Sequence, residues 1–193
     1  MTQAAPDAGT SRREQILDTA AALFAARGFH GVSVVEIGSA CGISGPALYK
    51  HFASKDAVLA EMLVSISERL LAVGTLRVDE AGTPAAAVRA LVAWHVDFAL
   101  QHRPLIVVQD RDWESLPDAA RERVRDLQRA YVDLWAEQLR LVDPSLGADP
   151  ARAQAHATFG LINSTPHSAM LPDEQMRQLL SRMALAALAA PLA

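Results

Sequence analysis

The sequence predicts an all-α protein of about nine helices. Apolar residues recur three and four positions apart along most of the chain, which is the period of one buried helix face. The composition is rich in Ala and Leu, and few stretches alternate apolar and polar residues as a half-buried strand would. Gly and Pro divide the 193 residues into segments of helical length. A chain of this length can hold one large domain, or a small domain and a larger one.

The first expected helix covers residues 12–29, with the sequence RREQILDTAAALFAARGF. Its apolar residues follow the i, i+3, i+4 spacing of an amphipathic helix. They are Ile16, Leu17, Ala20, Leu23 and Phe24. Gly28 lies where a glycine commonly closes a helix.

Two shorter helices follow, hinged at a glycine. Ile37 and Cys41 have helical spacing, and Gly42 tolerates the positive φ of a tight turn. Ser44 can cap the next helix, and Pro46 falls in its first turn, where a missing N–H costs nothing. A helix, a glycine-containing turn and a second helix form the helix-turn-helix signature, whose second helix enters the DNA major groove. The chain is therefore expected to bind DNA.

Residues 16–59, ILDTAAALFAARGFHGVSVVEIGSACGISGPALYKHFASKDAVL, combine these features in a fixed order. This stretch, about a quarter of the chain, closely resembles the amino-terminal domain of the TetR family of transcriptional regulators. The resemblance implies a three-helix helix-turn-helix DNA-binding domain, expected at residues 11–55. It also implies a larger helical domain for ligand binding and dimerisation, expected at residues 56–193. Residues 1–10 are expected to form a disordered leader.

The resemblance carries functional roles onto matching positions of the first domain. The residues expected at the DNA surface are Ser33, Ser44, Gly45, Pro46, Ala47, Tyr49, Lys50, His51 and Lys55. Ser33 should cap its helix and can also bind a phosphate. Tyr49, His51 and Lys55 are expected to contact phosphates, and Lys50 is expected at the edge of a guanine.

Gly45 departs from the commoner pattern of the family, because it offers no side chain where members often have a base-reading one. Close approach of the backbone at Gly45 is one substitute. Contact of Pro46 and Ala47 with thymine methyl groups is another.

Several of these positions also have a purely structural interpretation. Tyr49 could be a partly buried aromatic residue, His51 an ordinary surface histidine, and Lys50 a phosphate contact rather than a base reader. Leu48 and Phe52 are expected to face the core of the three-helix domain.

The net charge of −4 is unusual for a DNA-binding protein, but it is unevenly distributed. Residues 1–60 carry five Lys or Arg and five Asp or Glu, whereas residues 61–193 carry thirteen against seventeen. The acidity therefore belongs to the second domain. Phosphate binding needs local positive charge and directed N–H groups rather than a basic protein, so we expect modest nonspecific affinity and a shallow salt dependence.

In the second part of the chain, Gly and Pro delimit further helices. They are expected at residues 54–72, 83–102, 104–112, 117–142, 149–163 and 172–189. The first of them is expected to end near Gly74. Aromatic residues recur four positions apart on several of these helices, and the family resemblance implies that they line a cavity for a small effector. The residues expected there are Trp94, Phe98, Tyr131, Trp135, Phe159, Asn163 and His167.

The alternative is that these aromatic stripes form an ordinary core. His95 and His102 could add polar contacts inside a cavity. As metal ligands, the histidines lack the close Cys, His or carboxylate partners that zinc requires. No metal and no cofactor is therefore expected.

Residues 160–169, GLINSTPHSA, interrupt the apolar pattern. Pro166 should kink or stop the helix and leave backbone carbonyls unpaired. The polar side chains around it, such as Asn163 and Ser164, either satisfy that break or bind the polar part of a ligand. The break is similar to one in TetR-family members that sense acyl thioesters, so a fatty-acyl-CoA or related thioester is the expected effector.

The resemblance also implies a homodimer, formed by the helices expected at residues 149–163 and 172–189. The second of these has a broad apolar surface with small residues. It comprises Met176, Leu179, Leu180, Met183, Leu185, Ala186, Ala187 and Leu188. A symmetric pair would present two recognition helices to one face of DNA, so the operator should be an inverted repeat.

The expected function is a ligand-responsive repressor that acts in the cytoplasm. No run of about 18 uncharged apolar residues indicates a membrane span, and the first ten residues lack the features of a signal peptide. The single Cys excludes an internal disulfide, and Cys41 is interpreted as a small buried residue rather than a redox sensor. An enzyme is not expected, because no nucleophile–base pair or phosphate loop occurs. A DNA-binding activator or regulator without a small effector remains the alternative.

Overall fold

The computed structural model describes residues 11–189, and the expected disordered leader at residues 1–10 lies outside this range. The described part of the chain is helical throughout, as the sequence predicts. Its α-helices are α1 (Arg12–Arg27), α2 (Val34–Ala40), α3 (Gly45–Tyr49), α4 (Lys55–Asp79), α5 (Pro84–Gln101), α6 (Arg103–Arg111), α7 (Asp118–Val142), α8 (Ala148–Ile162), α9 (Thr165–Ser168) and α10 (Asp173–Ala189). A short 3₁₀ turn, η1 (Trp113–Ser115), precedes α7.

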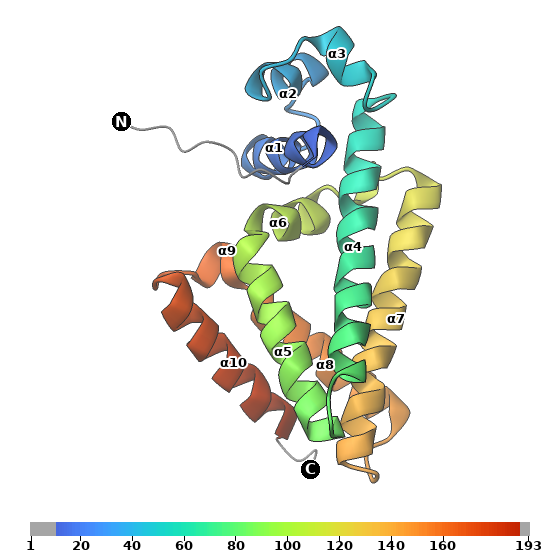
Figure 1. Ribbon diagram of the computed structural model, residues 1–193, viewed down its shortest axis with the longest axis vertical. Coiled ribbons are helices and arrows are strands. Elements are labelled where there is room, and N and C mark those ends of the chain that lie inside the picture. The colour runs from blue at the N-terminus through green and yellow to red at the C-terminus, as the bar shows by residue number, and fades with distance from the viewer. Residues whose placement is uncertain (1–10, 190–193) are drawn as a thin grey trace.

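The helices form two parts joined by a long central helix (Figure 1). The first three helices lie together at one end, and α4 runs from them along the length of the molecule. Alongside α4 lies α7, while α5, α8 and α10 pack together at the opposite end. Helix α6 lies directly against α1, between the two parts.

Many helix starts are fixed by a hydroxyl side chain. Ser11, Ser33, Ser44, Ser54 and Thr83 each precede a helix and accept a hydrogen bond from the backbone N–H three residues later. Each such cap contributes about 1 kcal/mol by satisfying an otherwise unpaired donor. The sequence therefore encodes these boundaries locally.

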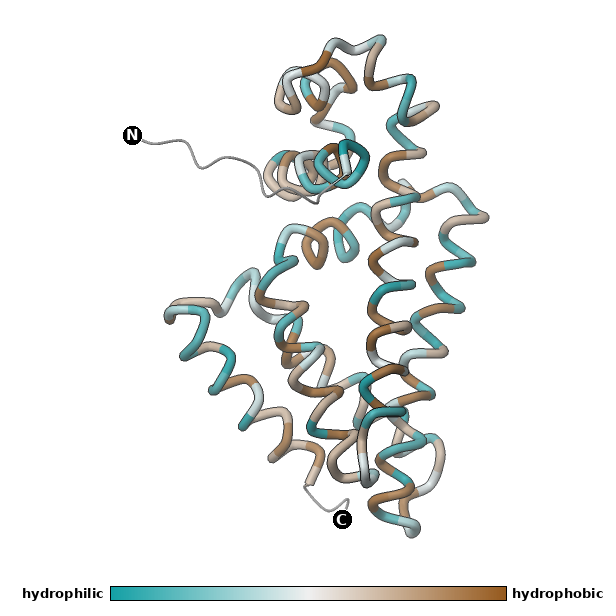
Figure 2. Tube along the Cα trace, viewed as in Figure 1, coloured by the Kyte–Doolittle hydropathy of each residue, from teal (hydrophilic) through white to brown (hydrophobic). Residues whose placement is uncertain are grey.

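The core of the amino-terminal part extends beyond the three helices that the sequence assigns to it. Ile16, Phe24, Ile37 and Leu48 are fully buried and pack with the first half of α4. Buried residues of the second part, including Val108 of α6, belong to the same cluster. Figure 2 shows the hydrophobic positions of these helices turned towards their neighbours. The boundary near residue 55 therefore crosses a continuous core, and it stays a prediction.

The expected end of the fourth helix near Gly74 is wrong, because α4 continues to Asp79. Gly74 is buried within α4 where it packs against α7 and α5. A Cβ atom at this position would lie 2.6 Å from Cε2 of Tyr131. The glycine therefore allows the helices to approach closely instead of ending one of them.

Gly74→Val is expected to lower the free energy of unfolding by about 2 kcal/mol, because the added methyl groups overpack a buried contact. The ring of Tyr131 is itself buried and cannot swing into solvent. Urea unfolding of the purified variant measures the change. Gly82→Val is the matched control, since a Cβ at Gly82 meets no neighbouring atom within 4 Å. Equal losses from the two substitutions would show that close packing at Gly74 is not the cause.

The break at Pro166 is present, but it produces an additional short helix rather than a simple stop. Helix α8 ends at Ile162, and Pro166 lies in the first turn of α9. The hydroxyl of Thr165 donates to the carbonyl of Ala99 on α5, at 2.8 Å. Part of the polar cluster around the break therefore ties the chain to a neighbouring helix.

Across residues 11–189, no helix combines the length and the apolar character that crossing a bilayer requires.

Candidate DNA-binding surface and effector cavity

Helices α2 and α3 have the geometry of a helix-turn-helix. Gly42 in the turn has φ of +69°, the left-handed conformation expected from the sequence. Gly38 brings α2 close to this turn, because a Cβ atom there would lie 2.9 Å from the carbonyl oxygen of Ile43. This role of Gly38 was not expected from the sequence, although a glycine inside a helix is a signal of close approach.

Helix α3 presents one face to the core and another to solvent. Leu48 is fully buried and Phe52 nearly so, which confirms their expected core positions. Tyr49 is 55% exposed, and Lys50 beside it is also exposed. Pro46 is also exposed, at the helix start. The side chains needed for the proposed contacts are therefore accessible.

Ser33 and Ser44 are capping residues in the structure. The hydroxyl of Ser44 accepts from the N–H of Ala47, at 3.3 Å. Ser33 forms a capping box with Glu36, in which its own hydroxyl donates to the Glu36 carboxylate at 2.7 Å. A phosphate contact by Ser33 would have to compete with this bond. His51 is half-buried, and its carbonyl accepts from Arg13.

Lys55 has a structural role that sequence reasoning missed. Its ammonium group donates to the carbonyl oxygens of Phe29 and Val32, both at 2.9 Å, and lies 4.2 Å from the centre of the Phe29 ring. These contacts hold the loop between α1 and α2 against the start of α4. The expected phosphate contact of Lys55 loses its support, because the charge is directed inward.

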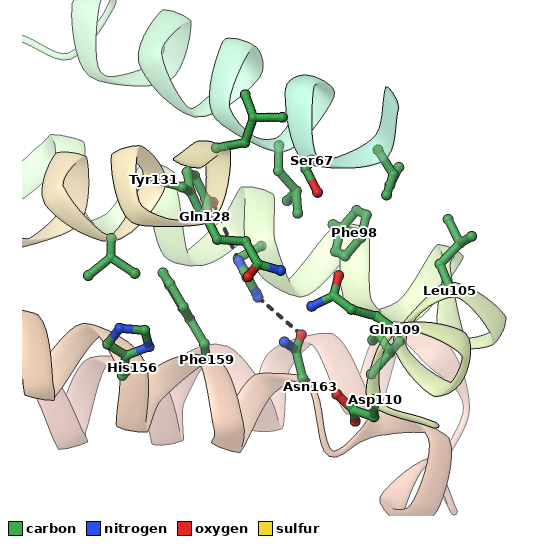
Figure 3. Close-up of a pocket in the computed structure, with 16 residues that line it drawn as sticks. Ser67, Phe98, Leu105, Gln109, Asp110, Gln128, Tyr131, His156, Phe159 and Asn163 are labelled. Atoms are coloured by element: carbon green, nitrogen blue, oxygen red, sulfur yellow. Dashed lines mark hydrogen bonds between the residues drawn. The ribbon is translucent and has the colours of Figure 1, made fainter. Parts of the chain in front are cut away.

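A cavity of about 210 Å³ lies in the second part of the protein (Figure 3). Helices α4, α5, α6, α7 and α8 contribute to its wall. Of the residues expected at a cavity, four line this one. They are Phe98, Tyr131, Phe159 and Asn163.

The other three expected residues lie elsewhere. Trp94 is directed at α4, where its indole N–H donates to the carbonyl of Leu70 at 3.2 Å. Trp135 is completely buried and packs edge-on against Phe159, behind the cavity wall. His167 is exposed on α9. For Trp94 and Trp135 the core interpretation therefore holds, because neither contributes to the lining.

His95 is the centre of the polar network in the cavity wall. Its Nε2 donates to Oδ1 of Asn163 at 3.1 Å, so its Nδ1 is left to accept from the hydroxyl of Tyr131 at 3.4 Å. The ring stacks on Phe159, with the centroids 4.7 Å apart. Burial lowers the pKa of His95 to about 4, even though the bond to Asn163 acts in the opposite direction. His95 is therefore uncharged at neutral pH.

Acidification from pH 7 to pH 5 is expected to lower the free energy of unfolding by about 2 kcal/mol through His95. The unfolded chain binds a proton there below the ordinary pKa of 6.5, whereas the folded chain does so only near 4. Stability is therefore lost as the pH falls through this window. Burial also lowers the pKa of His102, which adds an effect of the same sign.

Urea unfolding at both pH values tests this expectation, and His95→Gln should flatten the pH dependence. The same substitution at exposed His156 is the control and should leave the dependence in place. An unchanged slope in His95→Gln would contradict the role of His95.

Several polar residues of the cavity were not expected from the sequence, among them Gln109, Asp110 and Gln128. These three lie on amphipathic helices whose polar residues are usually solvated, so their positions follow only from how α6 and α7 pack. Burial raises the pKa of Asp110, and the charge of His167 acts against this. Within residues 11–189 no group of His, Cys, Asp and Glu has the arrangement of a metal site.

The end of α6 connects the two parts of the molecule. Asp112 is 6% exposed and accepts from the backbone N–H of Phe29 at 3.2 Å. Neighbouring Arg111 donates to the carbonyls of Phe24 and Ala25 at the end of α1, and it pairs with Asp112. Gln109 and Asp110, which directly precede Arg111, line the cavity. One helix therefore contacts both the cavity and the amino-terminal domain.

A helix-turn-helix with an exposed second helix, joined to a helical domain that contains a cavity, defines a DNA-binding transcription regulator rather than an enzyme. The chain belongs to the TetR family. Residues 16–62 match the family model described as bacterial regulatory proteins, tetR family. Residues 81–167 match the model described as the tetracyclin repressor-like C-terminal domain.

Known proteins with similar sequence or structure agree with this assignment. The HTH-type transcriptional repressor KstR2 of Mycobacterium tuberculosis is 28% identical over 130 residues, covering 67% of this chain and 65% of KstR2. The chain thus matches slightly less than two thirds of that relative's length. A TetR-family regulator from Bordetella parapertussis has a TM-score of 0.81 at 26% identity, over 92% of this chain and 94% of that one.

A further structural neighbour is AibR, solved in complex with isovaleryl coenzyme A and operator DNA. Its TM-score is 0.69 at 23% identity, and the alignment covers 90% of this chain and 97% of AibR. This similarity shows a shared fold.

Proposed function

We propose that this chain is a repressor that binds an inverted-repeat operator as a homodimer and leaves it when a small hydrophobic effector binds. The carrying observation is that α6 lines the cavity with Gln109 and Asp110 and holds the amino-terminal domain with Arg111 and Asp112. A ligand that moves α6 would therefore move the DNA-binding domain. Helix α4 adds a second connection, since it lines the cavity and begins with Lys55, which holds the loop between α1 and α2.

Repression by release requires that effector and DNA favour different arrangements of the two recognition helices. Each ligand then weakens the binding of the other by the same factor. At the DNA, Tyr49 and Lys50 are the accessible contacts of α3, with Pro46 at its start. Ser44 caps this helix, and Gly45 and Ala47 lie in its first turn, where the backbone would approach the bases.

The dimer is proposed to form through α8 and α10. Exposed small residues share one face of α8 at Ala153, Ala157 and Gly160. On α10, Met183 and the neighbouring alanines are exposed on a common face. This surface is narrower than expected from the sequence, because Met176 and Leu180 are buried against the protein's own core. Small residues on facing helices allow the close approach of a four-helix bundle.

A fatty-acyl-CoA or a related thioester is the proposed effector class. The support is a largely apolar cavity with carboxamide groups, together with a structural neighbour that was solved with isovaleryl coenzyme A. The operator is double-stranded DNA, and the proposed site of action is the cytoplasm.

Selection of binding sites from random duplex DNA tests the DNA-binding part of the proposal. An enriched inverted repeat is the expected result, and no enrichment at low salt would overturn it. Titration of the bound complex with isovaleryl-CoA and stearoyl-CoA then tests release. An operator complex that is indifferent to both would favour a regulator without an acyl-CoA effector.

The position of the operator relative to a promoter separates repression from activation. A site that overlaps the polymerase site supports repression, whereas an upstream site supports activation.

A further inference from the structure

The cavity offers hydrogen-bonding groups that the protein itself leaves unused. Gln109 and Gln128 project into it from α6 and α7 and face one another across it (Figure 3). Within residues 11–189, neither carboxamide has a hydrogen-bond partner. Asn163 accepts from His95 through Oδ1, which leaves its two amide N–H donors for another molecule. The free groups therefore include both donors and acceptors.

The charges around the cavity are unfavourable for an anion. None of the described residues that line it is Lys or Arg, and Asp110 adds a carboxyl group to the lining (Figure 3). His95 is uncharged, and His156 is exposed at the rim. A carboxylate buried without a cationic partner pays a large desolvation cost, and a neighbouring carboxylate increases it.

The size of the cavity limits what can enter it. A dry cavity of about 150 Å³ holds benzene, with its six carbon atoms. By proportion, the 210 Å³ of this cavity accommodates about eight non-hydrogen atoms. Ile66, Leu70, Phe98 and Phe159 provide the apolar walls for such a group.

We propose that the cavity binds an uncharged, hydrogen-bonding group of about eight non-hydrogen atoms, such as a short acyl thioester or amide, and rejects the corresponding free acid. This inference rests on the proposed effector-binding function and specifies its chemistry. A short-chain acyl-CoA meets the requirement, because its thioester is uncharged and its phosphates lie at the far end of the molecule. A long acyl chain would extend beyond the cavity.

The test uses isovaleramide and isovalerate, which have the same shape and differ in charge. Binding of each to the full-length protein at pH 7 is measured by NMR titration, without DNA. Isovaleramide is expected to bind at least about tenfold more tightly. Asp110→Asn should reduce this preference to below about threefold, because it removes the repelling carboxylate.

Gln128→Leu is expected to weaken isovaleramide binding about fivefold through the loss of one hydrogen bond. Gln101→Leu is the matched control, since Gln101 is exposed at the end of α5 and does not line the cavity. Binding of isovalerate as tight as that of isovaleramide would overturn the proposal, and so would binding of neither.

Failure of this proposal is distinguishable from failure of the proposed function. Binding of isovaleramide with the expected preference, combined with an operator complex unaffected by acyl-CoA, would retain the cavity chemistry and refute effector-controlled release. If isovaleryl-CoA released the operator but the protein bound isovalerate more tightly than isovaleramide, effector-controlled release would be retained and the proposed cavity chemistry refuted.

Discussion

Tyr49→Ala is expected to reduce operator affinity about a hundredfold, equally for all DNA sequences. A hydrogen bond to a charged phosphate contributes about 1.5 kcal/mol, or roughly tenfold in affinity. In a symmetric dimer the contact is lost twice, so the effect is squared. Tyr49 is exposed on α3, and its removal should therefore leave the free energy of unfolding nearly unchanged.

Tyr49→Phe is the matched variant, because it removes only the phenolic hydroxyl. Binding measured at fixed salt should fall nearly as far as in Tyr49→Ala if the hydroxyl donates to a phosphate. Full affinity in Tyr49→Phe would instead assign Tyr49 an apolar or structural role.

Lys50→Ala separates base reading from phosphate binding at the neighbouring position. If Lys50 contacts a base, the Lys50→Ala protein should lose its discrimination at one base pair of each half-site. The measurement compares the selected operator with versions substituted at single base pairs. A loss that is uniform across all these sequences would make Lys50 a phosphate contact and leave base recognition to the start of α3.

The amino-terminal domain was predictable from the sequence because its signals are local. A serine hydroxyl reaches a backbone N–H three residues away, and Gly42 adopts a left-handed conformation whatever lies around it. Lys55 is the exception in this region. Its inward direction depends on the carbonyls of Phe29 and Val32, which lie more than twenty residues away in the sequence.

The cavity was predictable in kind but only partly in its residues. Phe159 and Trp135 follow the same helical spacing, yet one lines the cavity and the other packs behind it. The difference arises from how α7 and α8 are rotated against each other, which no local pattern specifies. Gly74 shows the same limit, since a glycine that ends a helix and one that admits a neighbouring ring look alike in the sequence.

The junction between the two parts is the least visible in the sequence and the most consequential for regulation. Asp112 binds the N–H of Phe29, while Lys55 binds the carbonyl of the same residue. The loop between α1 and α2 is therefore bound both by Asp112 at the end of α6 and by Lys55 at the start of α4. Both α6 and α4 also line the cavity, so each connects it to the amino-terminal domain.

Asp112→Ala is expected to lower the free energy of unfolding by about 3 kcal/mol and to uncouple effector from operator. The substitution leaves the buried N–H of Phe29 without its acceptor and Arg111 without its carboxylate. A domain with a typical stability of about 5–15 kcal/mol remains folded after such a loss. Operator binding should then persist, with an affinity that no longer changes when effector is added.

Urea unfolding and operator titration, with and without isovaleryl-CoA, measure both effects. Asp112→Asn retains an oxygen for the Phe29 N–H and should lose about 1 kcal/mol while keeping most of the coupling. Asp79, exposed at the end of α4, provides the stability control, since Asp79→Asn should change the free energy of unfolding by less than about 0.5 kcal/mol. If Asp112→Ala were destabilised yet released its operator normally, α6 would support the fold without carrying the signal, and α4 alone would remain as the connection.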